Sequence, residues 1–113
     1  MAIDGITVNE DNTEGASQGI VRAIGRALEE IGLAAEGYAK AACPVDTGRL
    51  RNSITHVALP DEKAVYIGTN VEYAPDVELG TSRQKAQPFL RPAASEHGAQ
   101  YRQVLKKALG GSS

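Results

Sequence analysis

GIVRAIGRALEEIGLAAEGYAKAA, at residues 19–42, is the stretch of sequence that decides the fold. Its apolar positions recur at intervals of three or four, the spacing of one face of an α-helix: Ile20, Ile24, Leu28, Ile31, Ala35, Tyr38 and Ala42. Pro44 disfavours helical backbone at Cys43, so the helix should end there. The pattern therefore predicts one long helix near the start of the chain.

Four glycines interrupt this helix: Gly19, Gly25, Gly32 and Gly37. Each costs about 1 kcal/mol relative to alanine inside a helix. Such a helix would be poor in isolation, so packing against the rest of the chain must stabilise it. Close approach of another backbone is one reason for these glycines, and a merely suboptimal helix is the other.

Residues 3–8 lie upstream of the helix and alternate loosely, which favours a short strand. Asp11 or Thr13 can then accept hydrogen bonds from free backbone N–H groups at the start of a helix. Glu14 follows Asp11 by three residues, as in a capping box. We therefore expect the long helix to begin near this point.

The corner after the helix is the stretch VDTGRLRNSI, at residues 45–54. Asp46 and Thr47 can cap a helix, and Gly48 can adopt a backbone shape that other residues resist. We expect a turn here, followed by at most two helical turns.

Residues 54–59 and 64–69 read as two strands around a polar turn at residues 60–63. Their apolar and β-branched content predicts a β-hairpin. The side chains that we expect to face inward are Ile54, Val57, Leu59, Val65 and Ile67.

The last third of the chain predicts two helices around a loop. Pro75 suits the first position and Gly80 the C-terminal cap of a short helix over residues 73–79. Residues 81–87 are polar and basic, so we expect a mobile loop. Residues 88–92 should be extended by their prolines, and Pro92 should open a last helix. The expected inward face of that helix is Ala94, His97, Tyr101, Val104, Leu105 and Ala108.

These elements predict an α+β fold, in which a long N-terminal helix and a C-terminal helix pack on a small antiparallel β-sheet. The length of 113 residues and the 42% hydrophobic content fit a single domain over residues 1–113. Within it, residues 1–12 form an N-terminal strand or arm and residues 110–113 a flexible tail.

Charge is distributed unevenly along the chain. Residues 1–36 hold seven acidic and two basic side chains, whereas residues 83–109 hold six basic and one acidic. The intervening residues hold six acidic and four basic side chains, so the net charge is only −2. An acidic long helix and a basic last helix could meet within one fold or between neighbouring copies, or both could be solvated faces.

A catalytic or metal-binding function finds little support in the sequence. His56 and His97 lack the spacing of a metal site and are better explained as surface or packing residues. Cys43 is the only cysteine, and the negative end of the helix dipole would disfavour its thiolate. The carboxylates of Glu72, Asp76 and Glu78 could hold a divalent ion, but the last two would point to different faces of a short helix. We therefore expect no enzyme, no cofactor and no metal.

Other features of the composition bear on the compartment. The single cysteine suggests a reducing environment, and the N-terminus MAIDGITV lacks the pattern of a signal peptide. No run approaches the roughly 20 apolar residues needed to cross a bilayer. We therefore expect the protein in the cytoplasm of its host before any assembly, and no membrane partner.

Six basic residues in the last third suggest an alternative, a protein that binds nucleic acid without sequence preference: Arg83, Lys85, Arg91, Arg102, Lys106 and Lys107. No aromatic residue is interleaved with these charges for base stacking. If they meet DNA, we expect them to line a conduit.

Three segments occur in an order that is more specific than any of these patterns: CPVDTGRLRNSI at residues 43–54, VYIGTNVEYAPDVELGTS at 65–82 and KAQPFLRPA at 85–93. Over roughly residues 18–109, the chain resembles the tail-component family of tailed phages typified by gene product ten of phage Hong Kong ninety-seven. The resemblance implies a structural virion protein, a tail-completion or head–tail joining component of the neck or upper tail, including the tail terminator.

The resemblance also implies partners. Related neck and tail-terminator proteins form rings, commonly of six or twelve subunits, and we expect a hexameric ring here. Its neighbours would be the connector or head-closure protein and the tail tube protein, with possible nonspecific contact to DNA in the lumen.

The positions that match the family lie in the three segments and look like turn-forming and packing residues, not a catalytic set. Together with two basic loop residues and one departure from the family pattern, the candidates for a structural motif or interface are Pro44, Asp46, Thr47, Gly48, Leu50, Tyr73, Pro75, Asp76, Glu78, Gly80, Thr81, Arg83, Lys85, Pro88, Phe89, Leu90 and Pro92. Further matched positions are Ser53, Gly68, Ala74 and Ala93.

We expect these residues to fix the corner after the long helix, to pack on the sheet and, at Phe89 and Leu90, to seal its edge. Two positions depart from the family pattern. Asp76 stands where an aromatic residue is expected, and Leu79 where phenylalanine is common. A charged contact between Asp76 and a neighbouring copy could replace the usual apolar contact.

Overall fold

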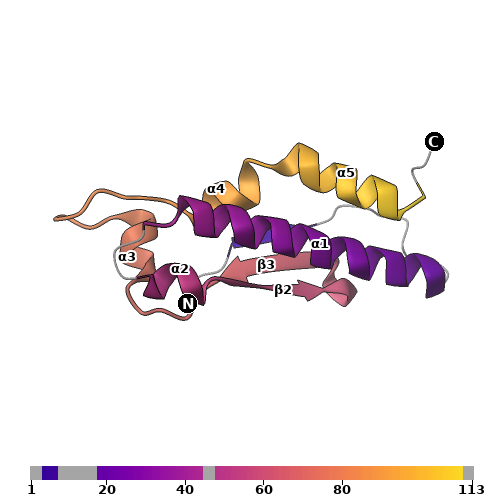
Figure 1. Cartoon of the computed structure of the whole chain (residues 1–113), viewed down its shortest axis with the longest axis horizontal. Coiled ribbons are helices and arrows are strands. Elements are labelled where there is room, and N and C mark those ends of the chain that lie inside the picture. The colour runs from indigo at the N-terminus through magenta and orange to yellow at the C-terminus, as the bar shows by residue number, and fades with distance from the viewer. Residues whose placement is uncertain (1–3, 8–17, 45–47, 111–113) are drawn as a thin grey trace.

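The computed structural model describes residues 4–7, 18–44 and 48–110, and it shows the predicted α+β fold. Helices cover one face of a small sheet (Figure 1). In chain order the elements are β1 (Asp4–Thr7), α1 (Gln18–Ala42), α2 (Arg49–Ser53), β2 (Thr55–Leu59), the 3-10 helix η1 (Pro60–Glu62), β3 (Ala64–Gly68), α3 (Ala74–Leu79), α4 (Leu90–Ser95) and α5 (Gly98–Ala108).

The sheet has three antiparallel strands in the order β1-β3-β2. β3 is the central strand, which explains why Ala64, Val65, Ile67 and Gly68 are all buried. β2 and β3 form the predicted hairpin, and β1 confirms the strand expected near the N-terminus. The capping residues predicted between β1 and α1 lie outside the described residues.

Helix α1 confirms the central prediction, but its two ends are less buried than expected. The buried face runs from Ile24 to Ala39, whereas Ile20 is 44% exposed and Ala42 is exposed too. A helix of 25 residues spans about 37 Å, while a strand of five spans only about 17 Å. The sheet is therefore too short to cover the whole apolar stripe.

The glycines of α1 have different explanations. A β-carbon at Gly32 would overlap the imidazole ring of His56 on β2 and lie 3.1 Å from Cγ1 of Val65. Gly32 thus admits a side chain of the sheet, and not another backbone, close to the helix axis. A β-carbon at Gly37 would meet nothing within 4 Å, so nothing in the packing requires that glycine.

The prediction that Val57 and Leu59 face inward is wrong. His56 and Ala58 face α1 instead, and Val57 lies opposite Tyr66 on the other face of the sheet, 50% exposed. Because side chains alternate along a strand, the placement of His56 against the helix turns Val57 and Leu59 outward together. The sequence led to the wrong register because the polar side chain of His56 occupies an inward position where an apolar residue was expected.

The predicted last helix is two helices. α4 begins at Leu90, so Pro92 is its third residue and does not open it, and residues 96–97 separate it from α5. At this break the hydroxyl of Tyr101 donates a 2.6 Å hydrogen bond to the backbone oxygen of Ala93. The bond provides a partner for a carbonyl group near the end of α4.

The main core lies between α1, β3 and α4. Its largest fully buried side chains include Phe89, Ile31 and Ile67, and a smaller cluster of Ile24, Leu28 and Val65 lies further towards the start of α1. Tyr38 of α1 stacks on His97, with ring centroids 3.5 Å apart, and this contact joins α1 to the start of α5.

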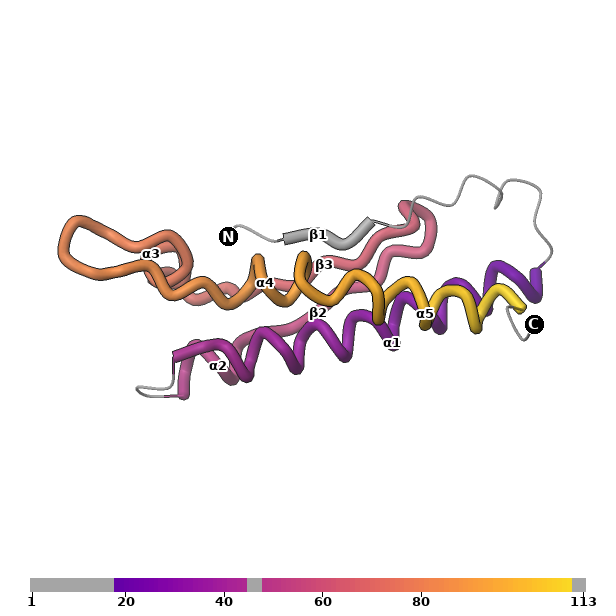
Figure 2. The backbone as a smooth tube through the Cα atoms, turned by 90° about the horizontal axis from the view of Figure 1, so that it is seen from above, coloured from indigo at the N-terminus to yellow at the C-terminus, as the bar shows by residue number. Residues whose placement is uncertain are grey.

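The described residues form an elongated shape of 51 × 24 × 21 Å. α1 and α5 run side by side along the long axis, and α3 with the loop that follows it lies at one end (Figure 2). The assignment of one domain to residues 1–113, with an N-terminal arm and a C-terminal tail, stays a prediction.

Candidate assembly surface

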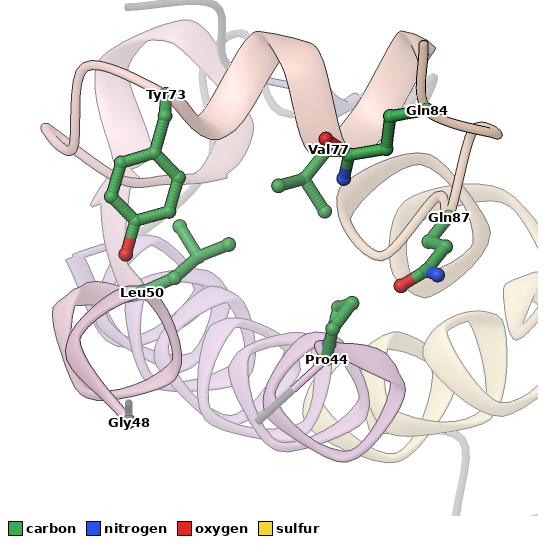
Figure 3. A pocket seen from close by; sticks show the side chains of 7 residues that line it. All are labelled: Pro44, Gly48, Leu50, Tyr73, Val77, Gln84 and Gln87. Atoms are coloured by element: carbon green, nitrogen blue, oxygen red, sulfur yellow. The ribbon is translucent and has the colours of Figure 1, made fainter. Parts of the chain in front are cut away.

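The end of the molecule opposite the start of α1 brings together residues from all three sequence segments. A cavity of about 150 Å³ is lined there by Pro44, Gly48, Leu50, Tyr73, Val77, Gln84 and Gln87. Pro44, Leu50 and Val77 point towards its centre, and the two glutamines lie on the side away from Tyr73 (Figure 3). Four of the predicted residues, Pro44, Gly48, Leu50 and Tyr73, thus share one hollow. Asp46 and Thr47 lie outside the described residues.

Gly48 sets the start of α2. Its φ of 79° lies in the left-handed region, as the sequence suggested, and its carbonyl accepts a 2.9 Å hydrogen bond from the backbone of Asn52. This turn places Leu50 in the core and leaves Arg49 at the surface. The local backbone shape therefore decides which side of α2 faces the cavity.

Arg49 joins α2 to the segment before α3. Its guanidinium donates two hydrogen bonds, of 3.2 and 3.0 Å, to the carboxylate of Glu72 and lies 5.5 Å from the ring centre of Tyr73. A backbone hydrogen bond and the charge of Arg49 hold the pKa of Glu72 below its usual value. This surface contact was not visible in the sequence, because 23 residues separate its partners.

Thr69, directly after β3, makes a second contact with α2, which the sequence analysis did not predict. It is a buried polar residue, and its hydroxyl bonds that of Ser53 and accepts a 3.1 Å hydrogen bond from the backbone of Val71. The hydroxyl of Ser53 also bonds the backbone oxygen of Leu50. Two features of the sequence could have pointed to this contact. Ser53 matches the family pattern, and Thr69 is a polar residue at the end of a predicted strand.

Glu78 holds the base of the loop that follows α3. Its Oε1 accepts hydrogen bonds from the backbone of Phe89 (3.0 Å) and Leu90 (2.9 Å), and its Oε2 accepts one from Arg91 (3.1 Å). These N–H groups are the free donors at the start of α4, where a negative charge also suits the helix dipole. A side chain of α3 therefore caps α4 across the loop.

The loop itself, residues 80–88, forms a hairpin that we call the 80–88 hairpin. Thr81 and Gln84 exchange backbone hydrogen bonds of 2.8 and 3.3 Å, and the backbone of Gln87 donates to the carbonyl of Val77 at 2.8 Å. At Gly80, φ is 79°, and a β-carbon there would lie 2.7 Å from the backbone nitrogen of Ala86. These bonds give the predicted loop a defined shape, while its mobility stays a prediction.

The 80–88 hairpin projects from the body of the molecule beyond α3 (Figures 1 and 2). Arg83 and Lys85 are exposed on it, and so are Thr81 and Pro88. The hairpin is therefore the part of this end that a neighbouring molecule would meet first.

The remaining candidates divide between core and surface. Phe89 and Leu90 are buried in the main core, whereas Pro75 and Pro92 are half-buried in the first turns of α3 and α4. The two departures from the family pattern, Asp76 and Leu79, are both exposed, and Leu79 is 69% exposed.

The face of the sheet away from α1 is a second surface. A hollow of about 520 Å³ lies there, lined without any charged residue by Ser53, Thr55, Val57, Leu59, Tyr66, Ile67, Gly68, Thr69 and Asn70. In the ribbon view no described helix covers this face of β2 and β3 (Figure 1). The sequence did not reveal this surface, because Val57 and Leu59 were predicted to face the core.

The reactive side chains are engaged in packing or ion pairs. Cys43 is buried, and burial raises the pKa of its thiol. His56 lies between two carboxylates of α1, with Nδ1 2.8 Å from Glu36 and Nε2 2.5 Å from Glu29. Burial favours neutral His56, but the hydrogen bonds to these carboxylates outweigh it and raise its pKa. The three-residue cluster Glu29–His56–Glu36 thus connects β2 to α1.

Metal binding by the three acids near α3 is not supported. Glu72 is paired with Arg49 and Glu78 caps α4, so the carboxylates do not converge. Among the described residues, no group of three or more potential ligands could hold a metal ion.

The charges also differ from the expected pattern. The basic residues do not form one patch, because Arg83 and Lys85 lie on the hairpin and Arg102, Lys106 and Lys107 lie on α5, whose last turns are at the other end (Figure 1). Helix α1 is not acidic as a whole, since its three acids are balanced by Arg22, Arg26 and Lys40. That α1 and α5 offer complementary faces to neighbouring copies stays a prediction.

Among the described residues, no helix is long and apolar enough to cross a membrane.

Comparison with protein families gave one match over residues 7–80, to the family described as "Bacteriophage HK97-gp10, putative tail-component". The match includes the corner after α1, the hairpin of β2 and β3, and α3 with Glu78 and Gly80, and it ends where the 80–88 hairpin begins. Comparison with curated proteins found no match, and comparison with solved structures found none either. Because the matched residues make up more than half of the chain, it belongs to the HK97-gp10 family of phage tail components, which are structural proteins.

Proposed function

We propose that this chain is a ring-forming component of the neck or upper tail of a long-tailed phage, which completes the tail or joins it to the head. The observation that carries the proposal is where the family positions lie. Gly48 and Leu50 line the cavity at one end, while Glu78 and Gly80 fix the base of the 80–88 hairpin. Residues that shape a projecting contact surface suit a protein whose task is assembly.

The open face of the sheet supports the same role. Val57 is half exposed there beside Tyr66, in a hollow without charged residues. An apolar hollow without charged residues on an uncovered sheet face suits contact with another protein. A component held between several neighbours would have such a surface covered after assembly.

The mechanism is assembly. The hairpin would be uncovered in a single copy and would be covered by a neighbour in the ring. Its internal hydrogen bonds already define its shape, so less conformational entropy is lost on contact than for an unstructured loop. The ring, which we propose to be hexameric, would meet the connector or head-closure protein on one side and the tail tube protein on the other.

Depletion of the protein during phage production tests this role. Electron microscopy of the lysate should show filled heads and tails that are separate, or tails of aberrant length. Purified virions should contain the protein at a fixed number of copies, located at the neck or the upper tail. Normal infectious particles that lack the protein would contradict the proposal.

Nonspecific binding of nucleic acid remains the alternative, and DNA within the lumen of a ring could contact the hairpin. Binding of DNA by a single copy would use basic residues that are spread from the hairpin, through Arg91 on α4, to α5. Binding by the unassembled protein that weakens steeply with salt would support the alternative instead.

A further inference from the structure

The 80–88 hairpin and the turn between β2 and β3 carry exposed side chains of opposite charge. Arg83 and Lys85 are exposed on the 80–88 hairpin at one end. Asp61 and Glu62 are exposed on η1, the turn between β2 and β3, which lies towards the other end of the long axis (Figures 1 and 2). The described body is 51 Å long, so the two groups cannot meet within one copy.

The positive charge of the hairpin has no counterpart beside it. Residues 80–88 contain no acid, and among the described residues no salt bridge involves Arg83 or Lys85. The hydrogen bonds between Thr81 and Gln84 hold the tip in a fixed shape. The two cations are therefore presented to the exterior on a preformed projection.

Among the described residues, four other carboxylates have partners within the chain. Glu29 and Glu36 bind His56, Glu72 binds Arg49, and Glu78 caps α4.

Asp61 and Glu62 are the two adjacent acids that no salt bridge engages in the described part of the chain. Glu62 accepts only a long hydrogen bond, of 3.4 Å, from Tyr66, and the neighbouring Lys63 offsets one of the two charges. Asp76 lies on α3, close to the base of the hairpin. In the part of the chain that the structure describes, η1 is thus the site where two adjacent acids without a salt bridge lie remote from the hairpin.

A hollow of about 170 Å³ lies beside these acids, lined by Val21, Ile24, Pro60, Asp61 and Lys63. Val21 is 44% exposed within it. Apolar walls with a carboxylate at the rim suit the side chain of lysine or arginine, whose carbon chain packs on apolar surface while its charge reaches the acid. The basic helix α5 does not interfere, because it packs on a different side of α1 from η1 (Figure 1).

We infer that the 80–88 hairpin of one copy docks on the η1 end of a second copy, so that Arg83 and Lys85 face Asp61 and Glu62. This inference rests on the proposed assembly of copies. The contact joins two different surfaces of the same chain, and such a head-to-tail contact generates a closed ring when the rotation between copies permits it. Opposite charges at its edge fix the orientation and the rate of encounter.

Charge reversal tests the contact. One variant carries Arg83→Glu with Lys85→Glu, a second carries Asp61→Lys with Glu62→Lys, and a third combines all four changes. Sedimentation at several protein and salt concentrations measures self-association. Each reversal alone should weaken association by about tenfold or more, and the combined variant should recover it to within about threefold of the parent. Association of the parent should weaken as salt rises.

A matched control carries Arg102→Glu with Lys106→Glu, the same change of charge at exposed positions of α5. It should associate like the parent. All substituted side chains are exposed, and recovery in the combined variant shows that the single reversals are folded.

The outcomes separate this inference from the function on which it rests. A parent that stays monomeric alone and with its tail partners would overturn the proposed function. A parent that assembles equally well with either reversal would overturn the hairpin contact alone. Loss of DNA binding without loss of assembly in the hairpin variant would also overturn it, and would assign the hairpin to nucleic acid.

Discussion

Glu78 shows how a single side chain connects two elements of this fold. Its carboxylate accepts three backbone hydrogen bonds at the start of α4, from 11 to 13 residues further along the chain. The sequence suggested Glu78 as a family position and, less plausibly, as a metal ligand. Its real partners could not be predicted, because backbone donors at the start of a helix carry no residue-type signal.

The Glu78→Ala variant should be less stable than the parent by about 1–3 kcal/mol, because backbone donors lose a charged acceptor. Glu78→Gln should lose less, since the amide oxygen still accepts. Urea denaturation measures both free energies of unfolding. Glu96→Ala, at an exposed position after α4, is the control and should change little. Equal stability of all three variants would show that the cap is unimportant.

Glycines at two positions of α1 should respond in opposite ways to alanine. Gly32→Ala should destabilise the protein by about 1–3 kcal/mol, because the new methyl group overlaps His56 and presses on Val65. Gly37→Ala should stabilise it by up to about 1 kcal/mol, since that position is open and alanine favours the helix. Thermal unfolding measures the stability of both variants. A Gly32→Ala variant that is more stable than Gly37→Ala would contradict this account of the packing.

His56 and Glu36 predict a pH window of maximal stability. The raised pKa of His56 gives a contribution that is complete below its ordinary value of 6.5 and is lost as pH rises through the folded value. Burial favours protonated Glu36, but hydrogen bonds to His56 and Lys40 outweigh it and lower its pKa. That contribution is present above the ordinary value of 4.5 and is lost as pH falls through the folded value.

The urea midpoint should therefore be highest between about pH 4.5 and 6.5 and decline on both sides. His56→Gln should flatten the decline on the alkaline side. If the urea midpoint of the variant declines on the alkaline side as steeply as that of the parent, the contact of His56 with α1 is not the cause of the decline.

Elements were predicted more reliably than their faces. α1, α2, α3 and the hairpin of β2 and β3 appear where the periodicity, the glycines and the prolines suggested. The errors concern contacts. The strand register depended on His56, a polar residue at an inward position, and the division of the last helix depended on Tyr101, whose bond to Ala93 follows from tertiary structure. The open sheet face was missed because the same wrong register placed Val57 and Leu59 in the core.

Tyr101→Phe tests the break between α4 and α5. Removal of the hydroxyl leaves the buried carbonyl of Ala93 without this donor and should cost about 1 kcal/mol. Burial raises the pKa of Tyr101 to about 12, so the bond should persist across the neutral and moderately alkaline range. Tyr66→Phe loses only an exposed 3.4 Å bond to Glu62 and should cost less in the same urea titration. The reverse order would argue against a structural role for the bond.

At the scale of the whole molecule, the chain is a long helix on a short sheet, with apolar and charged surfaces left open. The family match covers residues 7–80, and the residues of these surfaces lie within that stretch and directly after it. The sheet face, the cavity at the corner and the hairpin are all at the surface of a single copy. Assembly is the role that uses them together.

The central claim is that this protein acts by assembling, and its mass in solution tests that claim most directly. Light scattering with negative-stain imaging should be applied to the purified protein alone and mixed with the connector and tail tube proteins of the same phage. We predict ring-shaped particles of several times 11.9 kDa, either alone or with one of these partners. A monomer that ignores both partners but binds DNA with a steep dependence on salt would contradict the account.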